Sequence, residues 1–153
     1  MNLLLWRHAE AHDCDDPMQD GQRKLTSRGE KQAKRMAHWL DRQLPQGTQI
    51  WVSPAVRAEQ TAQALGRHYR ICPELAPDAD LAALRALLQW PRSKGHLLLV
   101  GHQPMLGQLI AELLETQADF CSVRKGAVWW LRSREREHRQ QTLLLTVQTP
   151  EFL

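Results

Sequence analysis

The sequence predicts a single α/β domain in which helices cover both faces of a mostly parallel sheet, giving three layers, α/β/α. Short apolar runs alternate with helical patterns as far as residue 115, an order that produces a parallel sheet covered on both sides. Two of these runs, residues 3–5 and 97–100, are wholly apolar and are typical of strands buried on both faces. Two β-rich runs near the end, 126–131 and 142–147, predict an antiparallel hairpin at one edge of the sheet.

The composition is that of one globular domain spanning residues 1–153, with 42% hydrophobic and 24% charged residues. The net charge of +3 is small and spread along the chain, so nucleic-acid binding is not expected. No leader and no membrane-spanning run is visible, so we expect a cytoplasmic protein with no membrane contact. Cys14, Cys72 and Cys121 are odd in number and widely spaced, which favours reduced thiols over disulfides or a thiolate zinc site.

A polar loop follows the first strand and leads into an amphipathic helix. Thr26 and Ser27 are both residues that favour helix N-caps, and Ser27 with Glu30 matches a capping box. Apolar side chains then recur at helical spacing until Pro45 and Gly47, which end the helix.

The middle of the chain holds further strands and helices. Residues 50–52 form a short apolar run, and Ser53 as cap with Pro54 as first helical residue predicts a second helix directly after it. A weaker strand at 69–72 and a short helix at 81–88 precede the next buried strand.

A strongly charged segment, residues 132–139, separates the two β-rich runs at the end of the chain. Runs of mixed sign are typical of solvated turns. We therefore expect this segment to form the exposed tip of the hairpin.

Polar residues follow three predicted strands at the points where those strands end. They are, in chain order, Arg7, His8, Ser53, Arg57, Gly101 and His102. Because right-handed crossovers bring the carboxyl ends of parallel strands to one edge of a sheet, we expect these residues to converge. Two arginines, two histidines and two helix starts around one point describe a pocket for a dianion with a nucleophile inside it.

Taken in order, these signatures resemble the motif series of the histidine phosphatase superfamily. The motifs are Arg7-His8-Ala9-Glu10, Leu25-Thr26-x-x-Gly29, Ser53-Pro54-x-x-Arg57-Ala58-x-Gln60-Thr61-Ala62 and Gly101-His102-x-Pro104. They cover residues 3 to about 115, and in size and lack of inserted caps the chain is most similar to the SixA-type phosphohistidine phosphatases. The resemblance implies the histidine phosphatase, or phosphoglycerate mutase-like, fold.

The resemblance also implies a metal-independent phosphatase without a cofactor, working through a covalent phosphohistidine at His8. Arg7, Arg57 and His102 would then grip the phosphoryl oxygens and neutralise their charge, with Ser53 and Gly101 contributing to substrate binding. One departure is Ala9, where most members have glycine. Because alanine does not readily adopt positive φ, Ala9 implies a conventional backbone there or a slight shift of the pocket.

The expected substrate is a phosphohistidine-bearing domain of a partner protein, which would place the enzyme in signal transduction. Residues 73–96 offer one short helix, too little for a lid, so the pocket should admit a protein surface. A leaving imidazole also needs less help from a general acid than an alkoxide does. Larger members of the superfamily supply that acid from the region after the third strand, and the resemblance implies Glu74, Asp78 and Asp80 as candidates here, with Glu74 as the possible acid. The alternative is a small-molecule phosphomonoesterase of the same fold, whereas mutase activity is not expected because enclosing insertions are missing.

Two other kinds of protein compete with the phosphatase hypothesis. Residues 8–16 contain many potential metal ligands, but His-x-Glu-x-His matches neither the helical zinc protease motif nor the deaminase motif. A non-catalytic phosphate-binding module stays open because fold does not fix function, although all four pocket residues of the enzyme are present.

Overall fold

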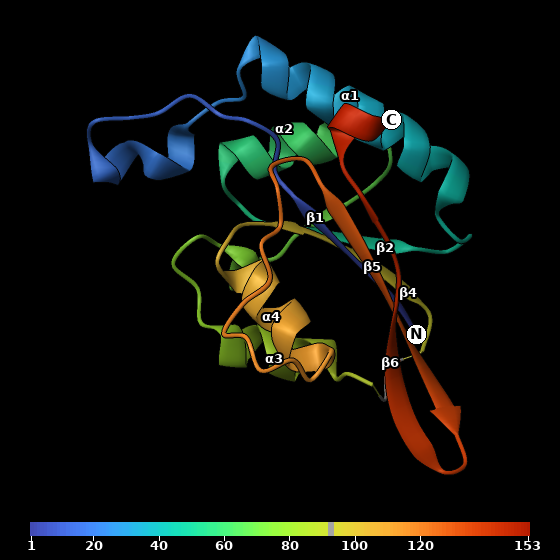
Figure 1. Cartoon of the computed structure of the whole chain (residues 1–153). Coiled ribbons are helices and arrows are strands. Elements are labelled where there is room, and N and C mark those ends of the chain that lie inside the picture. Colours follow the sequence, from blue (N-terminus) through green and yellow to red (C-terminus); the bar gives the residue numbers. More distant parts are fainter. Residues whose placement is uncertain (92–93) are drawn as a thin grey trace.

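The computed structural model describes residues 1–91 and 94–153, which form a six-stranded sheet between two layers of helices (Figure 1). The strands are β1 (Asn2–Arg7), β2 (Gln49–Val52), β3 (Arg70–Ile71), β4 (His96–Gly101), β5 (Val128–Arg136) and β6 (Arg139–Gln148). Their order is β3-β2-β4-β1-β5-β6, with β1 to β4 parallel and β5 and β6 antiparallel. The predicted three-layer fold with an antiparallel hairpin at one edge is confirmed.

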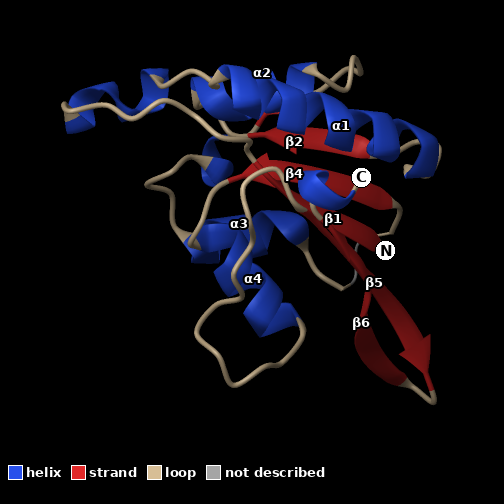
Figure 2. Cartoon of the chain, turned by 45° about the horizontal axis from the view of Figure 1, so that its top comes forward, coloured by secondary structure: helices blue, strands red, loops and turns tan. Residues whose placement is uncertain are grey.

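Within the described residues, four α-helices cover the sheet, two on each face (Figure 2). They are α1 (Ser27–Gln43), α2 (Val56–Gln63), α3 (Leu81–Leu88) and α4 (Met105–Leu113), with three short 3₁₀ helices η1 (Pro17–Gln22), η2 (Pro73–Leu75) and η3 (Pro150–Phe152). The first two α-helices share one face and the other two share the opposite face. None of the helices in the described part of the chain is long and apolar enough to cross a membrane.

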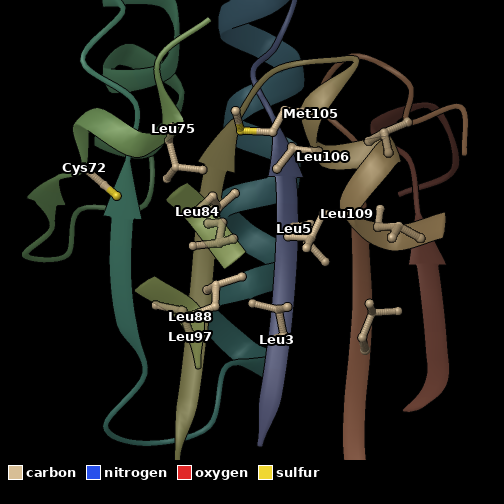
Figure 3. Close-up of a cluster of buried hydrophobic side chains, with 14 of the residues drawn as sticks. Leu3, Leu5, Cys72, Leu75, Leu84, Leu88, Leu97, Met105, Leu106 and Leu109 are labelled. Carbon is tan, nitrogen blue, oxygen red and sulfur yellow. The ribbon is translucent and has the colours of Figure 1, made fainter. Parts of the chain in front are cut away.

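The central strand β1 shows why this sheet is stable between two layers. Its side chains alternate, so Leu3 and Leu5 join the core under α3 and α4 while Leu4 and Trp6 join the core under α1 and α2. All four are fully buried, and Figure 3 shows Leu3 and Leu5 packed against leucines of α3 and α4. Burying a leucine contributes about 2 kcal/mol, so β1 anchors both layers and holds its carboxyl end in a fixed position.

The start of α1 corrects one sequence prediction. Thr26 is the N-cap, because its hydroxyl accepts a hydrogen bond from the Gly29 backbone N–H at 3.0 Å. The capping box expected for Ser27 and Glu30 is therefore wrong by one residue. A contact outside the helix also holds the Thr26 side chain, because its hydroxyl donates to Glu10 Oε2 at 2.7 Å.

The start of α2 corrects a second prediction. Ser53 is not its cap, because the helix begins at Val56 after Ala55. The Ser53 hydroxyl instead accepts from the Ala55 backbone N–H at 3.2 Å and lies 2.7 Å from a ring nitrogen of His102. Arg57 nevertheless lies in the first turn of the helix, as expected.

The charged segment near the end of the chain is mostly strand. Strands β5 and β6 continue through it until Arg136 pairs with Arg139, so only Glu137 and His138 form the turn. Both turn residues have positive φ, 53° and 63°, which matches the tight turns that best connect twisted antiparallel strands. The prediction of an exposed tip is confirmed, but the predicted turn is too long. This end of the hairpin extends beyond the helical layers, so its strands can form without alternating apolar residues (Figure 1).

The three cysteines are free thiols, as the sequence predicted. Cys14 is exposed, Cys72 is buried and Cys121 is half-buried. The described residues therefore contain no disulfide, and the fold is held by its two apolar cores.

Candidate active site

Adjacent strands bring the predicted polar segments to one edge of the sheet. Arg7, the last residue of β1, is the register partner of Gly101, the last residue of β4. Just beyond the strands, the His8 backbone N–H donates to the Gly101 carbonyl at 3.0 Å, and the Ser53 N–H donates to the Val100 carbonyl at 3.0 Å. The sheet ladder thus continues for one residue past each strand and fixes where the next side chains emerge.

One ring nitrogen of His8 is hydrogen-bonded, and the other makes no hydrogen bond within the described residues. The side chain is 5% exposed, and its Nδ1 lies 2.7 Å from the carbonyl oxygen of Ala9, so Nδ1 carries the proton and donates it. Burial lowers the pKa of His8 from 6.5 to about 3; the bond to Ala9 opposes this, and the nearby charge of Arg57 adds to it. The ring is therefore neutral at pH 7, with the lone pair on Nε2 available for attack.

The Ala9 backbone next to the nucleophile is conventional. Its φ is not in the left-handed region, and the residue is fully buried. The Ala9 N–H donates to the Thr61 hydroxyl on α2 at 3.0 Å, which fixes the carbonyl that orients His8. Alanine is therefore compatible with this position, as one of the two outcomes expected from the sequence.

His102 faces His8 across the site. The ring centroids are 5.1 Å apart, with the planes tilted by 52°. His102 Nε2 lies 2.7 Å from the Ser53 hydroxyl, whereas Nδ1 is buried and has no partner among the described residues. Burial, the proximity of His8 and the charge of Arg57 lower the pKa of His102 to about 2. With the Ser53 hydroxyl donating to Nε2, Nδ1 would carry the proton and could donate to an oxyanion.

Arg7 and Arg57 each use a terminal guanidinium nitrogen in a hydrogen bond to a backbone carbonyl and keep the Nε–H donor free within the described residues. Arg7 Nη1 donates to the Val123 carbonyl at 2.9 Å, and Arg57 Nη1 donates to the Asp20 carbonyl at 2.7 Å. The Nε atoms of both are buried and have no partner in the described part of the chain. Burial lowers the pKa of each arginine, and a neighbouring guanidinium lowers it further, Arg57 for Arg7 and Arg23 for Arg57. Such a concentration of positive charge is suited to an anion.

Asp20 in η1 is a site residue that the sequence reasoning missed. Its Oδ2 accepts from Arg57 Nη2 at 3.1 Å and its Oδ1 accepts from Arg23 Nε at 3.0 Å. Burial alone would raise the pKa of Asp20, but the charges and hydrogen bonds of Arg57 and Arg23 lower it, so it is a carboxylate at pH 7. A helical turn here was readable from Asp16-Pro17, a cap followed by proline, but no sequence signal predicts that it reaches Arg57.

Residues outside the pocket support the backbone that follows His8. The Gln60 side chain accepts from the Leu25 N–H at 2.7 Å, and the Gln32 side chain accepts from the Glu10 N–H at 3.0 Å. Gly29 of α1 passes so close that an added Cβ would lie 2.0 Å from the Glu10 carbonyl oxygen. Glycine is therefore required at this position by a close approach between two backbone segments.

Two of the three candidates for a general acid have other contacts, and the third is exposed. Glu74 in η2 accepts from the Cys72 thiol at 3.3 Å, and Asp80 caps α3 by accepting from the Ala82 N–H at 3.1 Å. Asp78 is exposed. Within the described residues, no hydrogen bond joins Glu74 to His8 or to the other pocket side chains.

The acidic loop after β1 does not assemble a metal-binding cluster. Residues 12–16 are exposed. Across residues 1–91 and 94–153, no group of three or more His, Cys, Asp or Glu side chains is arranged to hold a metal ion. The charged groups that gather at the sheet edge are mainly arginines, which bind anions.

Comparisons with known proteins place the chain in one family. Residues 3–84 match the model of the histidine phosphatase superfamily (branch 1). The sequence is 34% identical to the phosphohistidine phosphatase SixA of Escherichia coli over 121 residues, which cover 74% of each chain. It is also 34% identical to an uncharacterised protein of Picosynechococcus, over 100% of this chain and 99% of that one. The solved structure of the protein histidine phosphatase SixA complexed with tungstate matches 99% of both chains with a TM-score of 0.82 at 27% identity. The chain therefore belongs to the histidine phosphatase superfamily and is a phosphatase of the SixA type.

Proposed function

We propose that this phosphatase removes the phosphoryl group from a phosphohistidine side chain of a partner protein, through a covalent phosphohistidine at His8. The observation that carries the proposal is the 2.7 Å contact between His8 Nδ1 and the Ala9 carbonyl, which leaves Nε2 of a neutral ring without a hydrogen bond to any described residue. A neutral imidazole with one oriented lone pair is a competent nucleophile toward phosphorus.

The first chemical step transfers the phosphoryl group to His8. Nε2 of His8 forms a bond to phosphorus while the bond from phosphorus to the substrate imidazole nitrogen breaks, and Arg7 and Arg57 bind the non-bridging oxygens. The substrate ring carries a proton on its other nitrogen, so it leaves as neutral imidazole and needs no proton from the enzyme. His102 would donate a further hydrogen bond from Nδ1, the atom that has no partner among the described residues.

The second step returns the enzyme to its starting state. A water molecule attacks phosphorus, the bond to His8 Nε2 breaks, and the water's proton leaves with the inorganic phosphate or passes to solvent. Guanidinium groups provide the positive charge throughout, so activity should survive a strong chelator.

The choice of phosphohistidine over an alkyl phosphate rests on the leaving group. An imidazole has a reference pKa near 6.5, whereas an alkoxide, close to water at about 15.7, must be protonated as it leaves. The Glu74 carboxyl is engaged by Cys72, and Asp20 is held as a carboxylate by Arg57 and Arg23. The E. coli relative is a phosphohistidine phosphatase, which agrees with this choice.

A trapping experiment tests the covalent step. The enzyme is mixed briefly with a ³²P-phosphohistidine peptide and quenched in alkali, and acid-labile label on the protein is measured. Wild type and His68→Ala, which changes an exposed histidine, should carry label, and His8→Ala should carry none and show no turnover. Substantial turnover by folded His8→Ala would overturn the mechanism.

A substrate panel tests the substrate class against the small-molecule alternative. Phosphohistidine peptide and an aryl phosphate should be cleaved much faster than sugar phosphates, and Glu74→Gln should change phosphohistidine cleavage little. Efficient cleavage of an alkyl phosphate that is lost in Glu74→Gln would establish a small-molecule phosphomonoesterase instead.

A further inference from the structure

One face of α1 carries a row of basic side chains that the pocket does not use. Its members are Arg28, Lys31, Arg35, His38 and Arg42, which are all exposed. Their spacing of three, four, three and four residues places them on the same face of the helix. The row runs from Arg28 to Arg42, fourteen residue steps or about 21 Å at the rise of an α-helix. We refer to these five residues as the α1 basic row.

Carboxylates leave most of this row unneutralised. Helix α1 contains five Lys and Arg residues and two acids, so its charge of +3 equals that of the whole chain and is not spread evenly as the composition suggested. Of those acids, Asp41 is ion-paired with Arg67 at 2.9 Å, and Glu30 lies off the row. In the described part of the chain, the only ion pair made by the row joins Arg28 to Glu10 at 4.0 Å. Glu151 of η3 adds one carboxylate beside the first three members.

The row begins at the rim of the active site. Glu10, the partner of Arg28, lies two residues after His8, and its side chain also accepts from Thr26, the cap of α1. Gly29 packs directly against the Glu10 backbone. Figure 1 shows α1 starting near the loop and η1 segment that follow β1 and running away from them across the top of the molecule. A partner whose side chain reaches His8 therefore has its neighbouring surface near the start of α1.

We propose that the α1 basic row docks a carboxylate-rich surface of the protein that carries the phosphohistidine. This inference rests on the proposed function and adds how the partner is recognised. A row of exposed like charges steers an oppositely charged partner and raises the association rate, with an effect that salt screens over about 8 Å at physiological ionic strength. Because the row runs away from the nucleophile, it would contact acidic groups of the partner protein that lie outside the phosphoryl group.

A protein surface fits this row better than a nucleic acid. Single-stranded nucleic acids are bound by basic grooves interleaved with aromatic side chains that stack on bases. The aromatic residue of α1, Trp39, is half-buried and packs edge-on against Trp130, with ring centroids 6.4 Å apart. The row therefore offers charge for carboxylates and no stacking platform.

The test compares two phosphohistidine peptides in which the phosphorylated residue is joined through a short Gly/Ser linker to four glutamates or to four glutamines. The enzymes are wild type, Lys31→Glu/Arg35→Glu, and the control Arg134→Glu/Arg136→Glu, which makes the same charge change on the exposed hairpin. At low salt, wild type and control should cleave the glutamate peptide with about 10-fold higher kcat/KM than the glutamine peptide. The α1 variant should lose that preference, and 0.5 M salt should abolish it in all three.

Hydrolysis of p-nitrophenyl phosphate separates the two proposals. All three enzymes should cleave it with kcat/KM values within about twofold, which shows an intact pocket. Equal kcat/KM for both peptides in wild type, or equal loss of preference in the α1 variant and the hairpin control, would overturn docking by the row. Stronger inhibition by duplex DNA than by an unphosphorylated glutamate peptide would overturn it in favour of nucleic acid. Cleavage of the aryl phosphate but of neither peptide would instead refute the proposed substrate.

Discussion

Mild acid should destabilise this fold through the two buried histidines of the site. Burial is the main cause that lowers the pKa of His8 to about 3 and that of His102 to about 2. In the unfolded chain both rings take up protons near pH 6.5. Between that pH and about 3, the unfolded state binds more protons than the folded state, so the free energy of unfolding falls as the pH falls.

The size of the effect follows from the width of that window. Each pH unit below the unfolded pKa is worth about 1.4 kcal/mol per histidine, so moving from pH 7 to pH 5 should cost about 2 kcal/mol for each ring and about 4 kcal/mol for both. Asp20 does not contribute in this range, because its pKa lies below the ordinary carboxyl value and it stays ionised. Urea unfolding followed by fluorescence of the six tryptophans, at pH 7 and pH 5, measures the difference.

Single substitutions identify the groups responsible. His8→Gln and His102→Gln should each remove about half of the pH dependence, whereas His38→Gln, at an exposed position on α1, should leave it unchanged. A wild-type loss below about 1 kcal/mol, or an undiminished loss in His8→Gln, would show that the buried rings do not control acid stability.

Two further changes probe the surroundings of the pocket. Gly29→Ala should destabilise the fold by about 2 kcal/mol or more in urea unfolding, because its Cβ meets the Glu10 carbonyl; Gly21→Ala, with nothing within 4 Å of the added Cβ, should be near neutral. Asp20→Asn should lower kcat on an aryl phosphate about 10-fold while lowering KM, since Arg57 loses an orienting partner and the site loses a negative charge; an unchanged kcat with a raised KM would contradict this.

The strands and helices that define the site were predictable because local signals agreed with the tertiary structure. Helix α3 has the predicted bounds, Leu81–Leu88, since Asp80 is a good cap and leucines repeat at helical spacing. Strand β1 is apolar on both faces, ends at Arg7 and is followed directly by His8, so the position of these two residues at the sheet edge followed from the pattern alone.

The errors arose where the local sequence allowed more than one role for a residue and a contact distant in the sequence determined which role it has. Ser53 before a proline is a typical cap, but its hydroxyl is used by His102, 49 residues away in the sequence. Asp20 contacts Arg57 across 37 residues, and nothing in the spacing of a polar loop encodes that contact. Ser53 and Asp20 share one property, which is that each hydrogen-bonds to a pocket side chain distant in the sequence.

Unpartnered donors in the pocket connect its stability to its chemistry. The Nε atoms of Arg7 and Arg57 and the Nδ1 atom of His102 are buried without a partner among the described residues, and a buried polar group left unbonded costs about 1–3 kcal/mol. Asp20 satisfies only the outer nitrogens of Arg57, so its carboxylate orients the guanidinium without using every donor. An anion that accepts from these atoms would recover part of that cost, and its charge would raise the pKa of both histidines. Inorganic phosphate should therefore stabilise the wild-type fold and make its loss of stability in acid smaller, an effect that should be weaker in Arg7→Ala.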